Sequence, residues 1–309
     1  MLTVRHDSVS RAWHGLSRLL PPRLANRMQS RVPPGVRRIS IDCGDETIHF
    51  DRLNQSTIFA TIFWNGPCSE DGTANLFEAC ARDASVVFDI GSYIGYYAII
   101  AAKANPRARV FSFEPLPAAA ALQRHYLALN ECANVELLEL AIGDRVGEAE
   151  FFVPDRSASK VPNISSLRNV FRPGESFADR SARTIPVRVA TIDSFMATHK
   201  LGRLDLVKID VEEAEDAVVR GGMRAFSALR PDVIAEFTQG RRYADEAFSR
   251  LKGIGYRAFS PEGLTEIRTF ADFKPAHRLA RAAYGEVYFS FKSDAELTRL
   301  RAAVGTGAT

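Results

Sequence analysis

The sequence has few cysteines, and their spacing does not fit metal or disulfide chemistry. The four cysteines among the 309 residues are Cys43, Cys68, Cys80 and Cys132. No two of them form a Cys-x-x-Cys pair, so the pattern predicts neither a zinc site nor a disulfide framework. We therefore expect reduced thiols, as in a cytosol.

Long apolar runs are also absent. No stretch approaches the roughly 20 apolar residues of a transmembrane helix, and the basic N-terminus lacks the unbroken apolar core of a signal peptide. The net charge is only +3 and 46% of the residues are hydrophobic, which is ordinary for a globular protein. We therefore predict a cytoplasmic protein with no nucleic-acid partner, whose oligomeric state the sequence does not fix.

The N-terminal region is unusual in its charge. Residues 1–38 hold eight arginines and a single acid, Asp7. The stretch SRAWHGLSRLLPPRLANRM predicts a short amphipathic helix that Pro21 and Pro22 interrupt. We expect a solvated arm packed on the main domain, with contact to a membrane surface or a partner as the alternative.

From residue 71 onward, predicted helices alternate with predicted strands. Before that point, RRISIDC and ETIHFDR indicate a small hairpin or edge strands. The later strands are VVFDIG, RVFSFEP, VELLELAIG, TIPVRVATID, LDLVKID, PDVIAEF, YRAFS and EVYFSFK, with GEAEFFVP as a hairpin partner of VELLELAIG. The helices are residues 72–82, YYAIIAAKA, PAAAALQRHYLALN, EDAVVRGGMRAFSAL, EAFSRLKGIG and residues 294–304. This alternation predicts an α/β fold with a mostly parallel sheet and helices on both faces.

The alternation also divides the chain. We predict a basic arm and strand-containing extension over residues 1–70, a main α/β domain over 71–293, and a C-terminal helix and tail over 294–309. Residues 154–184 form a polar insertion without a clear period. An insertion of this length is too long for an ordinary connection, so we expect it to be functional or mobile.

Four acids each follow or end an apolar run, at Asp89, Glu114, Asp210 and Glu236. Because ligands bind beyond the carboxyl ends of parallel strands, this pattern places the four acids along one ligand-binding edge. Glu114 lies 23 residues after Gly91, where nucleotide-binding folds carry an acid that accepts hydrogen bonds from ribose hydroxyls.

The glycine turn after the first of these strands restricts which class of ligand can bind there. Gly91 permits an unusual backbone angle and Gly95 permits close approach of the next helix to the strand, although a tight turn without a ligand would need the same residues. A nicotinamide site normally reads G-x-G-x-x-G, and here Tyr93 replaces the second glycine. Since its side chain would crowd a diphosphate, the turn favours S-adenosylmethionine, which has no phosphate.

Each part of S-adenosylmethionine has a candidate partner in the sequence. Asp89 suits the ammonium group of its amino-acid end. Glu114 suits the ribose, and Pro115 fixes the turn that follows Glu114. Ala141 and Ile142 suit the adenine.

The ordered motifs resemble the FkbM-type methyltransferases over residues 72–240. The resemblance rests on VVFDIGSYIGYY, VFSFEPLP, the Asn130 that ends HYLALN, AIGD and LVKIDVEEAE, and NISSL resembles a serine-containing stretch of that family. It implies a Rossmann-like class I methyltransferase with a seven-stranded sheet that uses S-adenosylmethionine. It also implies an acceptor hydroxyl on a sugar, a glycan or a secondary metabolite.

The resemblance extends the predicted site. The cofactor-binding residues are Asp89, Gly91, Ser92, Tyr93, Gly95, Glu114, Pro115, Ala141, Ile142 and Asp210, and the catalytic candidates are Asp210, Glu212 and Glu236. A Mg²⁺ held by Asp210 and Glu236 is an alternative that so small a ligand set does not favour. The family usually reads K-I-D-V-E-G-x-E, and Glu213 replaces its glycine. That replacement keeps a non-catalytic binding module open as an alternative, and the acid after the second strand keeps a nicotinamide oxidoreductase open.

Overall fold

The computed structural model describes most of the chain. The described residues are 2–5, 8–19, 32–53, 57–66, 72–155, 161–162, 165–171, 181–275, 277–279 and 282–305. Within these ranges, no helix is both long and apolar enough to cross a membrane. Cys68, Pro21 and Pro22 lie outside the described residues, so the predicted helix break at the two prolines is not seen.

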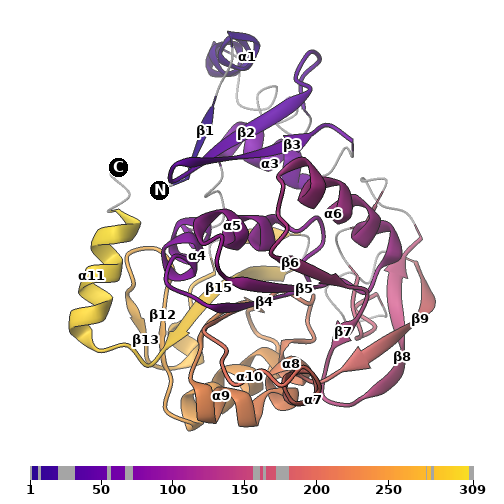
Figure 1. The fold of residues 1–309 in the computed structure, drawn as a ribbon, viewed down its shortest axis with the longest axis vertical. Coiled ribbons are helices and arrows are strands. Elements are labelled where there is room, and N and C mark those ends of the chain that lie inside the picture. Colours follow the sequence, from indigo (N-terminus) through magenta and orange to yellow (C-terminus); the bar gives the residue numbers. More distant parts are fainter. Residues whose placement is uncertain are drawn as a thin grey trace.

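A nine-stranded sheet forms the centre of the described structure, in the order β13-β12-β15-β11-β10-β4-β5-β6, with β14 pairing with β15 (Figure 1). The strands are β4 (Val86–Ile90), β5 (Arg109–Phe113), β6 (Val135–Leu138), β10 (Leu206–Ile209), β11 (Asp232–Thr238), β12 (Arg257–Phe259), β13 (Glu266–Ile267), β14 (His277–Leu279) and β15 (Ala282–Ser290). From β11 through β10, β4, β5 and β6 all neighbours are parallel, whereas β15 is antiparallel to β11. The predicted mostly parallel sheet is confirmed, and the short strands β13 and β14 extend the seven that were expected.

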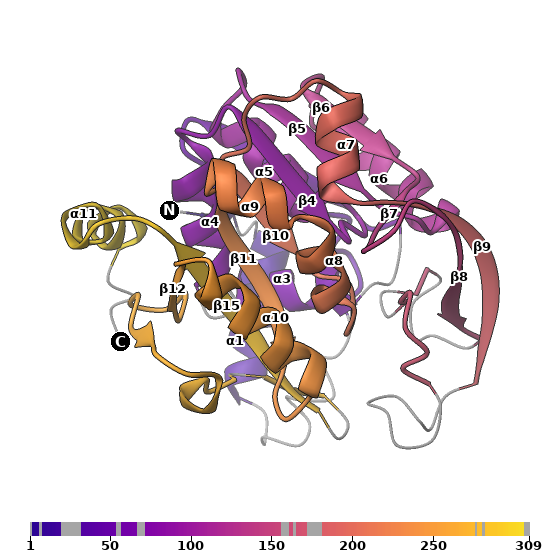
Figure 2. The same cartoon turned by 90° about the horizontal axis from the view of Figure 1, so that it is seen from below.

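Helices cover both faces of this sheet, as predicted (Figures 1 and 2). On one face lie α4 (Thr73–Ala81), α5 (Tyr96–Ala104) and α6 (Pro117–Leu129), and on the other lie α7 (Ile192–Thr198), α8 (Glu215–Gly221), α9 (Met223–Leu229) and α10 (Arg242–Gly253). The 3₁₀ helix η1 (Phe270–Asp272) precedes β14, and α11 (Asp294–Val304) packs on α4. Every residue of β4 is buried, which explains why its sequence is an apolar run rather than an alternating one.

Three sequence predictions about single elements were wrong. VELLELAIG is two strands, because the chain leaves the large sheet after Leu138 and β7 (Ala141–Ile142) pairs with β9 (Ala182–Ala190) in a separate sheet. The strand β8 (Gly147–Pro154) is antiparallel to β9 and not to VELLELAIG. EDAVVRGGMRAFSAL is interrupted at Gly222, where a Cβ atom would lie 2.7 Å from the ring of Phe226.

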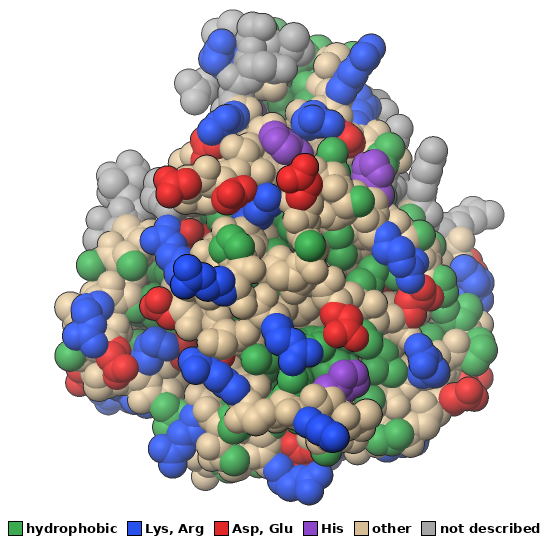
Figure 3. Space-filling view, in the orientation of Figure 1, with side chains coloured by type: hydrophobic (Ala, Val, Ile, Leu, Met, Phe, Trp, Pro, Cys, Tyr) green, Lys and Arg blue, Asp and Glu red, His purple; other side chains and the backbone are tan. Residues whose placement is uncertain are grey.

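The N-terminal extension forms a three-stranded sheet next to the α4–α6 layer (Figure 1). It contains β1 (Thr3–Arg5), α1 (Ser8–Leu19), β2 (Arg38–Cys43), β3 (Glu46–Asp51) and α3 (Thr57–Asn65), so the expected hairpin is confirmed. Asn130 ties it to α6, since its Oδ1 accepts from His49 N at 2.6 Å and its Nδ2 donates to His49 O at 2.9 Å. Basic and acidic side chains are interspersed over the face in Figure 3.

Candidate active site

The glycine turn between β4 and α5 has little room for side chains. Gly91 has a φ of +81°, and a Cβ atom there would lie 1.8 Å from the backbone oxygen of Asp210. Glycine is therefore required at this position both by the left-handed backbone and by the close approach of the chain after β10.

The second glycine has a different neighbour from the one expected. Gly95 has a φ of +80°, and a Cβ atom there would lie 2.6 Å from Nε2 of Gln123 on α6. The Gln123 amide accepts from Ser92 Oγ at 2.9 Å and donates to Ser112 Oγ at 2.5 Å. Ser92 and Gly95 thus shape the turn through a buried contact with α6.

A cavity opens beside this turn at the carboxyl ends of β4, β5 and β10. It includes about 530 Å³ of space not filled by atoms, a figure that counts the open solvent at its mouth. The predicted cofactor residues in its wall are Gly91, Tyr93, Glu114, Pro115, Ala141, Ile142 and Asp210, together with the catalytic candidate Glu212. Asp89, Ser92, Gly95 and Glu236 are not in the wall.

The cavity wall also contains residues that the sequence did not single out. They are Ile90, Phe113, Leu116, Leu140, Phe151, Pro162, Ser165, Leu167 and Val211. Several of these flank the predicted residues in the sequence, and apolar residues at strand ends are a signal that could have identified them. Pro162, Ser165 and Leu167 come from the polar insertion, where no period indicates which side chains turn inward.

Glu114 is a buried acid with fixed orientation. Its Oε1 accepts from Leu116 N at 2.8 Å and its Oε2 accepts from Tyr93 N at 2.9 Å. Burial raises the pKa of Glu114 to about 7, and these two backbone donors oppose part of that rise. The carboxylate therefore presents its remaining acceptor capacity to the cavity from a rigid position.

Asp89 lies behind the glycine turn. Its side chain is buried, and its Oδ2 accepts from Ala98 N in the first turn of α5 at 2.9 Å. Burial raises the pKa of Asp89 to about 7, although the charge of Lys208 acts in the opposite direction. The observed contact supports the start of α5, and the contact of Asp89 with a ligand ammonium group stays a prediction.

A group of carboxylates adjoins the cavity at Asp210. One carboxylate oxygen each of Asp210, Glu236 and Glu286 lies within 4.8 Å of the other two. Lys208 is fully buried among them, with its Nζ 2.9 Å from Glu286 Oε1 and 3.3 Å from Asp210 Oδ2. Asp210 is thus shared between the cavity and a second, acidic region.

The pKa values of both Lys208 and Glu236 are raised in this group. Burial lowers the pKa of Lys208, but Asp210, Glu286 and Glu236 outweigh that effect and the pKa lies well above its usual value. Burial, followed by the charges of Asp210, Glu212 and Glu286, raises the pKa of Glu236 well above its ordinary range. The same surroundings therefore favour the charged form of Lys208 and a bound proton on Glu236.

Glu213, which replaces the family's glycine, does not lie in the cavity wall. Its φ is +71° and that of Glu212 is +52°, so both acids adopt the left-handed conformation. The Glu213 side chain is buried, and its Oε1 lies 3.7 Å from Arg241 Nε. The substitution therefore strains the backbone at Glu213 and does not fill space in this cavity.

The fold and the cavity together define a Rossmann-like protein with a candidate ligand site at the edge of its sheet. The model of the methyltransferase FkbM domain matches residues 89–258, more than half of the chain. The chain therefore belongs to the FkbM methyltransferase family, and membership implies the use of S-adenosylmethionine. This places it apart from nicotinamide-dependent oxidoreductases.

Two curated proteins are similar to part of the chain. The 2-O-methyltransferase NoeI of Sinorhizobium fredii is 28% identical over 149 residues, which cover 47% of this chain and 60% of NoeI. The match thus spans less than two thirds of NoeI. The 31-O-demethyl-FK506 methyltransferase FkbM of Streptomyces tacrolimicus is 25% identical over 193 residues, covering 57% of this chain and 74% of that protein.

Solved structures also resemble the chain. The methyltransferase FkbM from Methylobacillus flagellatus KT has a TM-score of 0.39 and 16% sequence identity, covering 67% of this chain and 44% of that one.

Proposed function

We propose that the chain transfers a methyl group to a hydroxyl oxygen of a sugar, a glycan or a secondary metabolite. The observation that carries this proposal is the position of Asp210, which lines the cavity and also lies within 4.8 Å of Glu236 and Glu286. A donor in the cavity would adjoin a region able to accept protons. The names of the two curated relatives both describe O-methylation, which supports an oxygen acceptor.

The cavity has the groups that S-adenosylmethionine requires. Glu114 can accept from the ribose hydroxyls, and Ala141 and Ile142 offer apolar surface to the adenine. Gly91 packs against the backbone of Asp210, and both line the cavity, where Asp210 can face the amino-acid end. When bound, S-adenosylmethionine supplies an activated methyl group, whose carbon–sulfur bond breaks as the oxygen–carbon bond forms.

The protein then has two tasks, alignment and proton removal. Holding the acceptor oxygen in line with the methyl group contributes roughly 7–11 kcal/mol, whereas a general base contributes about 10²–10⁴-fold, roughly 3–5 kcal/mol. We assign the proton of the acceptor hydroxyl to the carboxylate of Glu236, an oxygen of which lies within 4.8 Å of a carboxylate oxygen of the cavity residue Asp210. Glu212, in the cavity wall, would border the acceptor.

We propose no metal in this reaction. Hard cations such as Mg²⁺ prefer several carboxylate ligands, and the Asp210, Glu236 and Glu286 group could offer three. However, the Lys208 ammonium already contacts two of these acids, so a divalent cation would lie beside a buried positive charge.

Methyl transfer to a panel of glycosides and secondary-metabolite alcohols, followed with methyl-labelled S-adenosylmethionine, tests the proposal. We expect label in a methyl ether, a 10²–10⁴-fold lower kcat in Glu236→Gln, and an unchanged donor Kd. Glu266→Gln, an acid on β13 outside the site, is the matched control. Label found only on nitrogen or carbon would refute the oxygen acceptor, and an unchanged kcat in Glu236→Gln would remove Glu236 as the base.

A further inference from the structure

A segment of the polar insertion crosses the candidate donor cavity. We call residues Ser165–Phe171 the strap. Ser165 and Leu167 of the strap lie in the cavity wall. On one side the strap is fixed to β8, since Phe152 N donates to Ser166 O at 2.8 Å and Ser166 N donates to Phe152 O at 3.1 Å.

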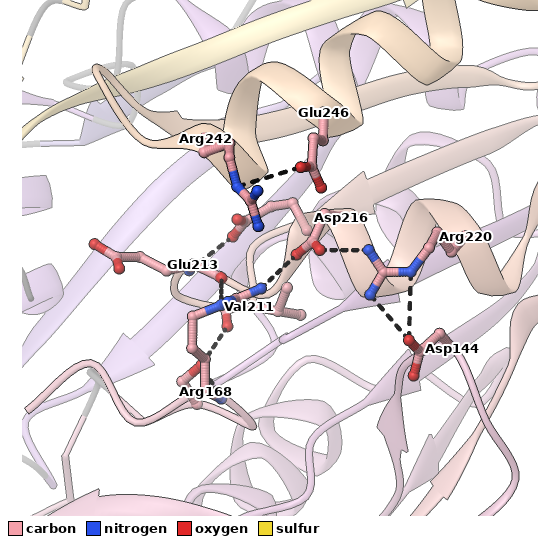
Figure 4. Close-up of polar contacts among 10 residues, drawn as sticks. Asp144, Arg168, Val211, Glu213, Asp216, Arg220, Arg242 and Glu246 are labelled. Atoms are coloured by element: carbon pink, nitrogen blue, oxygen red, sulfur yellow. Dashed lines mark hydrogen bonds and ion pairs between the residues drawn. The ribbon is translucent and has the colours of Figure 1, made fainter.

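On its other side the strap is fixed to the turn after β10. Arg168 Nε donates to the backbone oxygen of Glu213 at 2.7 Å, and its Nη2 donates to Asp216 Oδ1 at 2.9 Å (Figure 4). The guanidinium group also lies over the ring of Tyr243, 4.6 Å from its centroid. A planar group with several donors can make these contacts at once, and lysine cannot.

The partner of Arg168 is itself held in place. Asp216 is buried, and its second oxygen accepts from Arg220 Nη1 at 2.5 Å. Arg220 also donates to Asp144 through Nη2 at 2.9 Å (Figure 4). The anchoring of the strap is therefore a connected network of charge-assisted hydrogen bonds rather than one surface ion pair.

The strap brings to the cavity one polar atom for which no described residue is a hydrogen-bond partner. Ser165 Oγ is buried and has no hydrogen-bond partner among the described residues. A buried hydroxyl without a partner is unfavourable, and native proteins rarely keep one without a reason. The neighbouring Ser166 has its own partner, because its Oγ donates to Val211 O at 3.3 Å.

We propose that Ser165 is a ligand-binding residue whose hydroxyl hydrogen-bonds the S-adenosylmethionine held in the cavity, and that Arg168 is the positioning residue for it. The inference rests on the proposed placement of the donor in this cavity. It gives the polar insertion a function in donor binding. The sequence had assigned this segment no particular residue role.

Calorimetric titration of the full chain with S-adenosylmethionine tests this proposal. We expect Ser165→Ala to weaken donor binding roughly three- to tenfold, the value of one neutral hydrogen bond. Arg168→Gln should weaken it to a similar extent. In the double variant the loss should be clearly smaller than the product of the two single losses, because both changes remove the same contact.

The control is Arg224→Ala, which removes an exposed Arg–Asp ion pair with Asp193 away from the cavity and should leave the Kd unchanged. Thermal unfolding identifies a misfolded Arg168 variant, and Ser165→Ala alone then decides the proposal. Wild-type affinity in Ser165→Ala, or losses that multiply in the double variant, would overturn it. Failure of the wild-type chain to bind the donor would instead refute the donor site itself.

Discussion

Removal of the Glu114 carboxylate is the sharpest perturbation of the candidate donor site. In Glu114→Ala the cavity loses its acceptor for ribose hydroxyls. Two backbone donors, Tyr93 N and Leu116 N, also lose the carboxylate that binds them at 2.9 and 2.8 Å. The first loss acts on ligand binding and the second acts on the fold, so the two must be measured separately.

The expected magnitude follows from the kind of contact that is lost. A hydrogen bond to a charged group contributes roughly 1.5–3 kcal/mol, so one lost contact weakens donor binding by about 10- to 150-fold. Each backbone donor left buried without an acceptor costs about 1–3 kcal/mol of folding free energy. We therefore expect a large rise in Kd together with a lower unfolding temperature.

Calorimetry with S-adenosylmethionine measures the first quantity and thermal unfolding measures the second. Glu139→Ala is the matched control, because Glu139 directly follows β6 much as Glu114 follows β5 but pairs with Arg124 outside the cavity. A folded Glu114→Ala protein whose Kd lies within twofold of the wild-type value would show that Glu114 does not hold the donor. The placement of the ribose would then be wrong.

Three further predictions concern the same edge of the sheet. Because the pKa of Glu114 is raised to about 7, and the ionised form accepts ribose hydroxyls, donor affinity should increase as pH rises from 6 to 8. Calorimetry should show this dependence weakened in Glu114→Gln, and an unchanged pH profile would contradict the reasoning. The folding stability of the ligand-free protein should change in the opposite direction. Between the ordinary pKa of a glutamate and about 7, Glu114 keeps a proton in the folded state that it has lost in the unfolded state. Its contribution to stability is therefore lost as pH rises through about 7, which thermal unfolding measures. Gly91→Ala should lower the unfolding temperature strongly, since strain at φ +81° adds about 1–3 kcal/mol to the clash with Asp210 O. Gly202→Ala, with nothing within 4 Å of the added Cβ, is its control, and equal unfolding temperatures for the two variants would refute the argument.

The large sheet could be predicted because its strands are continuous apolar runs. β4 is buried along its whole length, and α5 begins and ends where the sequence predicts. The second sheet could not be predicted in the same way. β7 has only two residues, and its pairing with β9 depends on a partner about 50 residues away. No local periodicity carries information about such a long-range pairing.

The residues of the candidate site also differ in how far the sequence could predict their positions. Residues at the ends of parallel strands, such as Glu114 and Asp210, could be placed near the cavity because topology alone brings strand ends together. Asp89 has the same sequence signal, yet its carboxylate turns toward α5. The direction of a side chain at a strand end is decided by the helix packed against it, which the apolar pattern does not specify.

Glu213 departs from the family motif, yet its side chain does not enter the candidate donor cavity. The left-handed backbone at Glu213 presents its carbonyl oxygen to Arg168, and a glycine with the same φ would present it equally well. The glutamate side chain adds an ion pair with Arg241, just before α10. This contact joins α10 to the turn after β10 and opposes backbone strain of roughly 1–3 kcal/mol. Since the side chain leaves the cavity wall unchanged, the substitution alters how α10 is attached and gives no reason to doubt methyl transfer.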